Sequence, residues 1–377
     1  MKKVLLVSIG FSPNIGGIET HFDDLIKEVH KKGIKINVIT YMPLTTNTRA
    51  YFFEKRKDCA IIRLPIFRGF FYCFKNNPFL EFVYLTPLLF LFLPIFLLFN
   101  FRSIGVIHSH GLVAGFVCVF WGLVFRLPVI TTTHSIYLFP KKGLYRFIAK
   151  HIFAFSSKVL CLSSQSAREI EDLGISPNKI TVFTYWINTD LFSPVKKAKE
   201  KTGWDSFTVL FVGRLVPEKG VKVLLNSKKI WSKKIKLAII GIGPLDSLVF
   251  QQAKKDKNLI YLGAVSQSDL PLYYSAADLL IVPSIHEEGF GRVILESLSC
   301  GTPVLASNRG AIPEAISEKV GELIEINEKS IKEKVEELFD KNSKIKIYQK
   351  NARKYALEKF SSRNAQKIIN VYLDLMQ

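Results

Sequence analysis

Short apolar runs alternate with longer amphipathic segments along the chain, and this alternation predicts an α/β fold. The apolar run Lys3–Ile9 is followed by a glycine-rich loop and by an amphipathic segment that opens near Ile18 and stops at Gly33. Another apolar run, Ile34–Thr40, then completes a β-α-β unit. The same order begins again at Thr208–Val212. Because such runs are typical of parallel strands buried on both faces, we predict two doubly wound domains.

The domain limits follow from the length of the chain and from its charge runs. A chain of 377 residues is long enough for two domains with separate cores. We expect one domain over residues 1–190, a second over 206–355 and a terminal helix over 356–377, with the charged run Lys196–Lys201 as a linker. Further strands are predicted at Gly105–Gly111, Val129–His134, Val159–Leu162, Ile180–Thr184, Leu237–Ile240, Leu259–Gly263 and Leu279–Val282, and helices over Ile331–Phe339 and Ile345–Leu375.

One apolar run, Phe82–Phe99, is about long enough to cross a bilayer. We expect Pro87 and Pro94 to break a helix there. A membrane crossing would also separate residues 1–81 from the rest of their own sheet, so we reject it. The run lies within a segment that has no acidic residue between Glu81 and Glu169.

The net charge of +20 indicates a nucleic acid or an anionic membrane surface as partner, or simply a lysine-rich proteome. Basic and aromatic residues alternate at near-helical spacing over Lys141–Lys158, which suits an anionic lipid surface. We therefore expect peripheral docking on a membrane, while core helices with a basic rim remain the alternative. Nucleic acid is not expected, because no nucleic-acid-binding motif accompanies the charge.

The five cysteines are scattered, odd in number and without a C-x-x-C pair. This usage is typical of reduced thiols and a cytoplasmic setting. The opening segment MKKVLLVSIG has too short an apolar run for a cleavable signal peptide and is expected to form a strand.

The stretch Pro283–Val304 contains the most specific candidate for a ligand-binding site. An apolar strand stops at Pro283, and a loop with adjacent carboxylates and two glycines follows. A helix is predicted to begin near Arg292. Glu288 would then lie in the loop and Glu296 on the first turns of the helix. Carboxylates beside the free amides of a helix N-terminus suit a polyhydroxylated anionic ligand such as a nucleotide sugar.

Two strand ends carry histidines. His108 and His110 would point to one face of their strand, where hydrogen-bonded histidines are a better interpretation than a zinc site, because no third ligand accompanies them. His134 ends another strand and is followed by Ser135.

The stretch PSIHEEGFGRVILESLSCGTPV resembles the E-x7-E motif of the retaining glycosyltransferases of family 4. The Gly16-Gly17 pair, GRLVPEKG at 213–220 and GIGPL at 241–245 resemble further motifs of that family in the same order. The resemblance implies the GT-B fold, in which two doubly wound Rossmann-like domains face each other across a cleft. It also implies a last helix that crosses back to the first domain.

The resemblance assigns roles to individual residues. Arg214 and Lys219 would hold the donor diphosphate, because fixed cations stabilise the charge on a departing nucleoside diphosphate. Glu288 would bind the sugar hydroxyls and Glu296 the ribose hydroxyls, and His134 would polarise the sugar side. No D-x-D sequence occurs, so neither a metal nor a cofactor is expected. Further donor contacts are expected from Gly17, Gly213, Ala264, Val265, Phe290, Gly291, Arg292 and Val293.

The implied activity is transfer of a hexosyl unit, with retention, from a UDP- or GDP-sugar to a hydroxyl of a glycan or lipid-linked acceptor. A nucleotide-sugar epimerase of similar architecture and a non-catalytic nucleotide-sugar-binding relative remain open. The first β-α-β unit lacks G-x-G-x-x-G, which argues against a dinucleotide enzyme. We expect a cytoplasmic protein, peripheral on the cytoplasmic face of the membrane.

Overall fold

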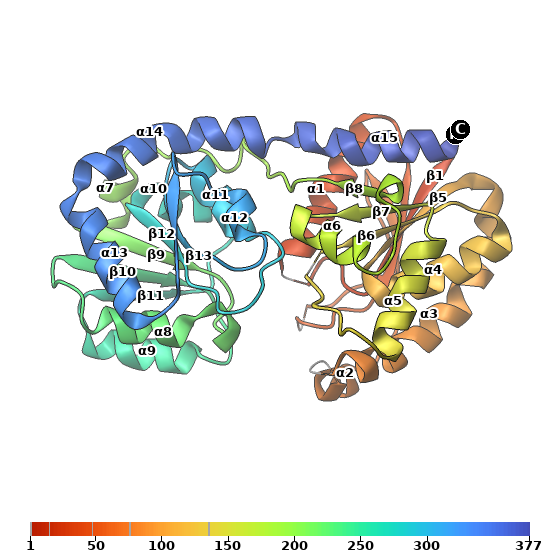
Figure 1. Ribbon diagram of the computed structural model, residues 1–377, viewed down its shortest axis with the longest axis horizontal. Coiled ribbons are helices and arrows are strands. Elements are labelled where there is room, and N and C mark those ends of the chain that lie inside the picture. Colours follow the sequence, from red (N-terminus) through yellow and green to blue (C-terminus); the bar gives the residue numbers. More distant parts are fainter. Residues whose placement is uncertain (1, 15, 47, 75–76, 135) are drawn as a thin grey trace. The chain divides into compact units, whose positions relative to one another are not determined.

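The computed structural model describes residues 2–377 except 15, 47, 75, 76 and 135, and it divides into two compact units (Figure 1). The first unit comprises Met1–Tyr185 and Ser362–Gln377, and the second comprises Trp186–Ser361. Each unit is built on a mostly parallel sheet with helices packed on it. The predicted α/β fold class is therefore confirmed.

The first unit contains an eight-stranded sheet in the order β3-β4-β2-β1-β5-β6-β7-β8. All neighbouring strands are parallel except the pair β3 and β4. The strands are β1 (Lys3–Ser8), β2 (Ile36–Tyr41), β3 (Phe53–Lys55), β4 (Cys59–Leu64), β5 (Ile104–His110), β6 (Val129–Thr133), β7 (Lys158–Cys161) and β8 (Ile180–Val182). The helices are α1 (Gly17–Lys31), α2 (Arg68–Phe74), α3 (Pro78–Asn100), α4 (Gly111–Phe125), α5 (Leu144–Phe155), α6 (Ser164–Glu171) and α15 (Ala365–Met376).

Helices α3, α4 and α5 lie side by side over this sheet (Figure 1). Alternate strand residues such as Leu5, Val7 and Ile107 join the buried residues of these helices in one core. The terminal helix α15 belongs to the first unit, where the Tyr372 hydroxyl lies 2.6 Å from His108 Nδ1.

Helix α3 runs unbroken through both prolines, so the expectation that Pro87 and Pro94 break it is wrong. Proline removes an amide donor and leaves the carbonyl four residues earlier without its helical bond. For Pro94 that carbonyl belongs to Phe90, and it accepts a hydrogen bond of 2.9 Å from Trp121 Nε1 on α4. A donor from the neighbouring helix thus replaces the bond that the proline removes.

The second unit contains a six-stranded parallel sheet in the order β11-β10-β9-β12-β13-β14. Its strands are β9 (Phe207–Val212), β10 (Ile235–Ile240), β11 (Leu259–Gly263), β12 (Leu279–Val282), β13 (Val304–Ser307) and β14 (Gly321–Ile324). Its helices are α7 (Ala198–Thr202), α8 (Val221–Lys228), α9 (Asp246–Lys255), α10 (Leu270–Ala276), α11 (Arg292–Ser299), α12 (Ile312–Ala315), α13 (Glu328–Asp340) and α14 (Asn342–Lys359).

Candidate active site

The central strands of the second sheet, β9 and β12, are neighbours although two strands separate them in the chain. The chain leaves β9 for β10 and β11 on one side, and continues from β12 to β13 and β14 on the other. The loops at the carboxyl ends of β9 and β12 therefore meet where the strand order reverses. In open α/β sheets this is the place where ligands bind.

These two loops bring Lys219 and Glu288 into direct contact. Lys219 Nζ donates to Glu288 Oε1, and Ser284 Oγ donates to the same oxygen at 2.6 Å. Glu288 is only 8% exposed. Burial by itself would raise the pKa of this carboxyl, but Lys219 and Ser284 outweigh burial and hold the pKa below its usual value. Glu288 is therefore an ionised, buried carboxylate at neutral pH.

The second oxygen of Glu288 is less engaged. Oε2 lies 3.9 Å from His286 Nε2, which is beyond hydrogen-bond distance. Among the residues that the structure describes, no hydrogen bond to Oε2 is present. This oxygen is therefore available to accept a hydrogen bond from a ligand hydroxyl.

Backbone contacts fix the two loops against each other. The Ile285 amide donates to the Glu218 carbonyl at 2.9 Å. Gly220 has φ +72°, and a Cβ there would lie 1.8 Å from the Pro283 carbonyl oxygen. Only glycine can take this position, since it has no Cβ to clash and tolerates the left-handed conformation. The GRLVPEKG turn is thus locked on the strand end that precedes Glu288.

Helix α11 begins at the predicted residue, Arg292, and carries Glu296 on its second turn. The Tyr274 hydroxyl donates to Glu296 Oε2 at 2.9 Å, and Arg292 Nε lies 3.3 Å from Oε1. Glu296 is 6% exposed. The N-cap is Gly291, which has no side chain to occupy the first amides of the helix. Phe290 turns inward instead, with its ring centroid 6.0 Å from that of Phe360.

Arg214 lies five residues before Lys219 on the same turn, and its side chain is exposed. Within the described part of the chain, its guanidinium has no hydrogen-bond or ion-pair partner. The Gly213 amide joins this turn to the end of β10, because it donates a hydrogen bond of 3.0 Å to the Ile240 carbonyl. Ala264 and Val265 follow edge strand β11, and within the described residues no hydrogen bond or ion pair joins them to Lys219 or Glu288.

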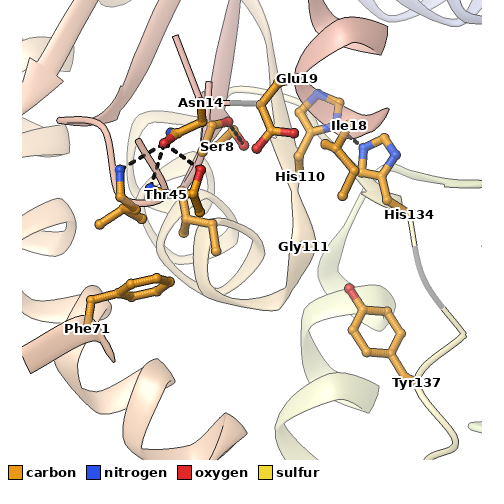
Figure 2. Close-up of a pocket in the computed structure, with 13 residues that line it drawn as sticks. Ser8, Asn14, Ile18, Glu19, Thr45, Phe71, His110, Gly111, His134 and Tyr137 are labelled. Atoms are coloured by element: carbon orange, nitrogen blue, oxygen red, sulfur yellow. Dashed lines mark hydrogen bonds between the residues drawn. The ribbon is translucent and has the colours of Figure 1, made fainter. Parts of the chain in front are cut away.

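The first unit holds a separate cavity of about 210 Å³. Figure 2 shows Asn14, Glu19, His110 and His134 among its polar lining residues, with Phe71 on another side. It lies at the carboxyl ends of β1 and β5, beside the start of α1. The cavity lining therefore combines polar and apolar side chains (Figure 2).

A hydrogen-bonded chain of histidines ends at this cavity. His134 Nδ1 lies 2.7 Å from the Tyr185 hydroxyl, and His134 Nε2 lies 2.8 Å from His110 Nδ1. Burial lowers the pKa of His134 to about 3, so its ring is neutral at pH 7. His108 is outside this chain of histidines and is hydrogen-bonded to the hydroxyls of Tyr372 and Thr132. The prediction of hydrogen-bonded strand-end histidines is confirmed, while Ser135 lies outside the described residues.

Gly17 is the first residue of α1, one position before the cavity-lining Ile18 and Glu19. A Cβ at the preceding Gly16 would lie 2.4 Å from Glu19 Oε2, so the carboxylate folds over the start of the helix. Sequence reasoning singled out the glycines of this loop but not Glu19 as a site residue. It also missed Ser284 and Tyr274, because their role depends on contacts across elements that no local pattern reveals.

The structure therefore brings some of the predicted residues together in two places, while Arg214, Ala264 and Val265 have no hydrogen bond or ion pair with either group among the described residues. Lys219 and Glu288 are in contact, and so are Arg292 and Glu296, all in the second unit. Gly17 and His134 accompany the cavity of the first unit.

Comparison with known proteins identifies the family. The model of Glycosyltransferase Family 4 matches residues 15–191, and that of Glycosyl transferases group 1 matches residues 194–355. An uncharacterized 41.2 kDa protein in the cps region of Klebsiella pneumoniae is 31% identical over 304 residues, which cover 76% of this chain and 82% of that protein.

Solved structures show the same fold. Sucrose-phosphate synthase from Thermosynechococcus elongatus superposes with a TM-score of 0.81 at 20% identity, covering 100% of this chain and 99% of that one. The HepE protein of Anabaena in complex with UDP-glucose gives a TM-score of 0.75 at 18% identity, covering 99% and 100%. The chain therefore belongs to glycosyltransferase family 4, with the GT-B fold and a nucleotide-sugar donor.

Proposed function

We propose that this glycosyltransferase moves a hexosyl unit from a UDP- or GDP-sugar to a hydroxyl of a glycan or lipid-linked acceptor, with retention of configuration. The observation that carries the proposal is the contact between Lys219 and Glu288 at the switch point of the second sheet. On adjacent loops, a cation can bind the diphosphate of a nucleotide sugar and a buried carboxylate can bind its sugar hydroxyls.

The cations serve the diphosphate. Lys219 neutralises Glu288, and Arg214 is exposed without a partner among the described residues. A bound diphosphate would attract both cations and would accept hydrogen bonds from the first amides of α11. These groups stabilise the charge that builds on the leaving phosphate without requiring a divalent ion.

The carboxylates serve the sugars. Glu288 Oε2 would accept a hydrogen bond from a hydroxyl of the transferred hexose, since Lys219 and Ser284 occupy only Oε1. Glu296, held by Tyr274 and Arg292, would accept from the ribose hydroxyls. Charged acceptors make stronger hydrogen bonds than neutral ones, so both contacts favour specificity for a nucleotide sugar.

Retention is what the family resemblance implies, and the bonding of the carboxylates bears on the mechanism by which it would occur. Glu287 Oε2 accepts from the Gly310 amide at 2.5 Å, and Glu296 is bonded to Tyr274. Glu287 is thus engaged by the Gly310 amide and Glu296 is assigned to the ribose, so we assign neither as the second carboxylate of the acid–nucleophile pair of a double displacement. We assign front-face transfer, in which the leaving phosphate takes the proton of the acceptor hydroxyl.

The acceptor would enter the cavity of the first unit, whose lining combines Glu19, His110 and His134 with apolar side chains. His110 Nε2 is buried and has no hydrogen-bond partner among the described residues. It is therefore free to bond an acceptor hydroxyl. His134, neutral and held by Tyr185, orients His110.

The test is to incubate the protein with a panel of UDP- and GDP-hexoses, with and without glycan and polyprenyl-linked acceptors. We expect free nucleotide to form only with an acceptor, and the anomeric proton coupling of the product to match that of the donor. Conversion of the sugar without nucleotide release would establish an epimerase instead. An inverted product would refute front-face transfer.

A further inference from the structure

Helix α3 is apolar on its outer face as well as on its inner one. Its inner residues Leu85, Leu89, Leu93 and Leu97 are at most 1% exposed and belong to the core. A surface helix normally turns polar residues outward. On α3 the outward positions are instead Phe79, Leu80, Val83, Leu88, Leu91, Ile95, Leu98 and Phe99, all of them exposed.

The neighbouring helices extend this exposed apolar surface. The Phe120 ring on α4 lies 5.0 Å from that of Phe90 on α3. We call the apolar face the set of exposed side chains on the three adjacent helices α3, α4 and α5 (Figure 1). Besides the α3 residues it contains Phe120, Leu123 and Val124 on α4, and Leu144, Phe147 and Phe155 on α5. Contiguous apolar surface of this kind marks an interaction site.

Cations border the apolar face at both ends. Arg102 and Arg126 are exposed where α3 and α4 end, and the Arg102 guanidinium lies 5.7 Å from the Phe101 ring centroid. At the opposite end, the exposed Lys141 and Lys142 precede α5. Lys150 lies on α5 itself. No acidic residue occurs over 82–168, and the acidic residues that flank this segment are Glu81 on the first turn of α3 and Glu169 on α6.

We propose that the apolar face docks on the surface of a lipid bilayer that contains anionic lipids, with α3 lying in the plane of the interface. Apolar side chains would enter the boundary between headgroups and acyl chains, and the bordering cations would bind anionic headgroups. This docking does not require the proposed transfer reaction.

Neither a membrane crossing nor a second copy explains the face as well. Helix α3 is long and apolar enough to span a bilayer, and 22% of its most apolar stretch is buried. Crossing would remove its four inner leucines from the core. It would also break the hydrogen bond from Trp121 to the Phe90 carbonyl and that from Tyr41 to the Leu85 carbonyl. A second copy would bring two positive borders together.

The test is flotation of the full chain with phosphatidylcholine vesicles, with and without phosphatidylglycerol. We expect the chain to float with the anionic vesicles and to partition at least about tenfold less into the neutral ones, because several cations contribute. High salt should weaken the binding. A chain that stays in solution with both vesicles, or that forms dimers through this face instead, would overturn the proposal.

Two pairs of variants locate the surface. Leu91→Asp with Ile95→Asp should abolish flotation, whereas Ile230→Asp with Ile347→Asp, equally exposed on the second unit, should float like the wild type. Unchanged thermal melting of each variant would show that the fold is kept, since all four side chains are at least 51% exposed. Equal flotation of the two pairs would overturn the proposal.

Charge gives an independent readout. Lys141→Gln with Lys142→Gln should weaken binding to anionic vesicles by about fivefold per charge, or about 25-fold in all. The control Lys254→Gln with Lys255→Gln removes two adjacent exposed lysines from α9 of the second unit and should leave binding unchanged. If both pairs weakened vesicle binding equally, the net charge of the chain alone would explain the attraction. That result would overturn docking through the apolar face.

Discussion

The ion pair of Lys219 and Glu288 can be tested apart from catalysis by Lys219→Met. The variant keeps the aliphatic stem and removes the charge, so Glu288 stays buried with only the Ser284 hydrogen bond to Oε1. Removing one partner of a fully buried pair costs about 3–5 kcal/mol. The Lys219 side chain is 23% exposed, and water can therefore replace part of the lost interaction. We expect a loss of about 2 kcal/mol near neutral pH.

The pH dependence should reverse sign in this variant. In the wild type the pKa of Glu288 is lowered, so its contribution to stability is present above the unfolded pKa and is lost as pH falls through the folded pKa. Without Lys219, burial dominates and raises the pKa of Glu288 above its unfolded value. The loss of stability in Lys219→Met should then be largest at neutral pH and shrink as pH falls through the raised pKa.

Urea unfolding followed by circular dichroism at about pH 7.5 and about pH 5 measures both effects. The control is Lys332→Met, which breaks the more exposed pair with Glu336 and should cost less than about 0.5 kcal/mol. A loss for Lys219→Met that is equal at both pH values, or as small as the control, would refute the assignment of Glu288 as a buried carboxylate held ionised by Lys219.

Three further predictions follow from single contacts. Trp121→Phe removes the donor to the α3 carbonyl freed by proline and should lower the free energy of unfolding by about 1–3 kcal/mol in urea titrations, whereas an unchanged midpoint would contradict that role. Gly310→Ala should reduce transfer activity by at least about tenfold, because a Cβ at φ +56° would lie 2.3 Å from the Glu288 carbonyl oxygen; full activity would contradict the fit. Burial lowers the pKa of His108 and of His134 to about 3, so stability should fall as pH drops from about 6.5 toward that value, and His134→Gln should reduce the slope; an unchanged slope would place the titration elsewhere.

Local sequence patterns were enough to predict those elements whose structure depends on residues close together in the sequence. Strands β11 and β12 and the start of α11 coincide with their predicted residues, because apolar runs and glycines mark them directly. Glu288 in a loop and Glu296 on the helix follow from the same spacing. The E-x7-E motif therefore predicted its own local geometry.

Contacts between distant residues were beyond such patterns. The prolines of α3 were misjudged because the compensating donor, Trp121, comes from another helix. Strands β3 and β4 were not predicted; they form the antiparallel edge of the sheet, where pairing joins Phe53–Lys55 to residues 60–62. Whether the outer face of α3 was covered could not be read from its composition, because an apolar helix has the same sequence signature when buried. The structure shows one buried and one exposed side.

The central claim is that cations of the GRLVPEKG turn grip the donor diphosphate, and calorimetric titration with the nucleoside diphosphate of the preferred donor tests it most directly. Lys219→Ala and Arg214→Ala should each weaken binding by roughly 10- to 100-fold, the worth of a charge-assisted hydrogen bond. Lys222→Ala, on the exposed side of α8, is the matched control and should bind like the wild type. Wild-type affinity in the Lys219 and Arg214 variants would contradict the account.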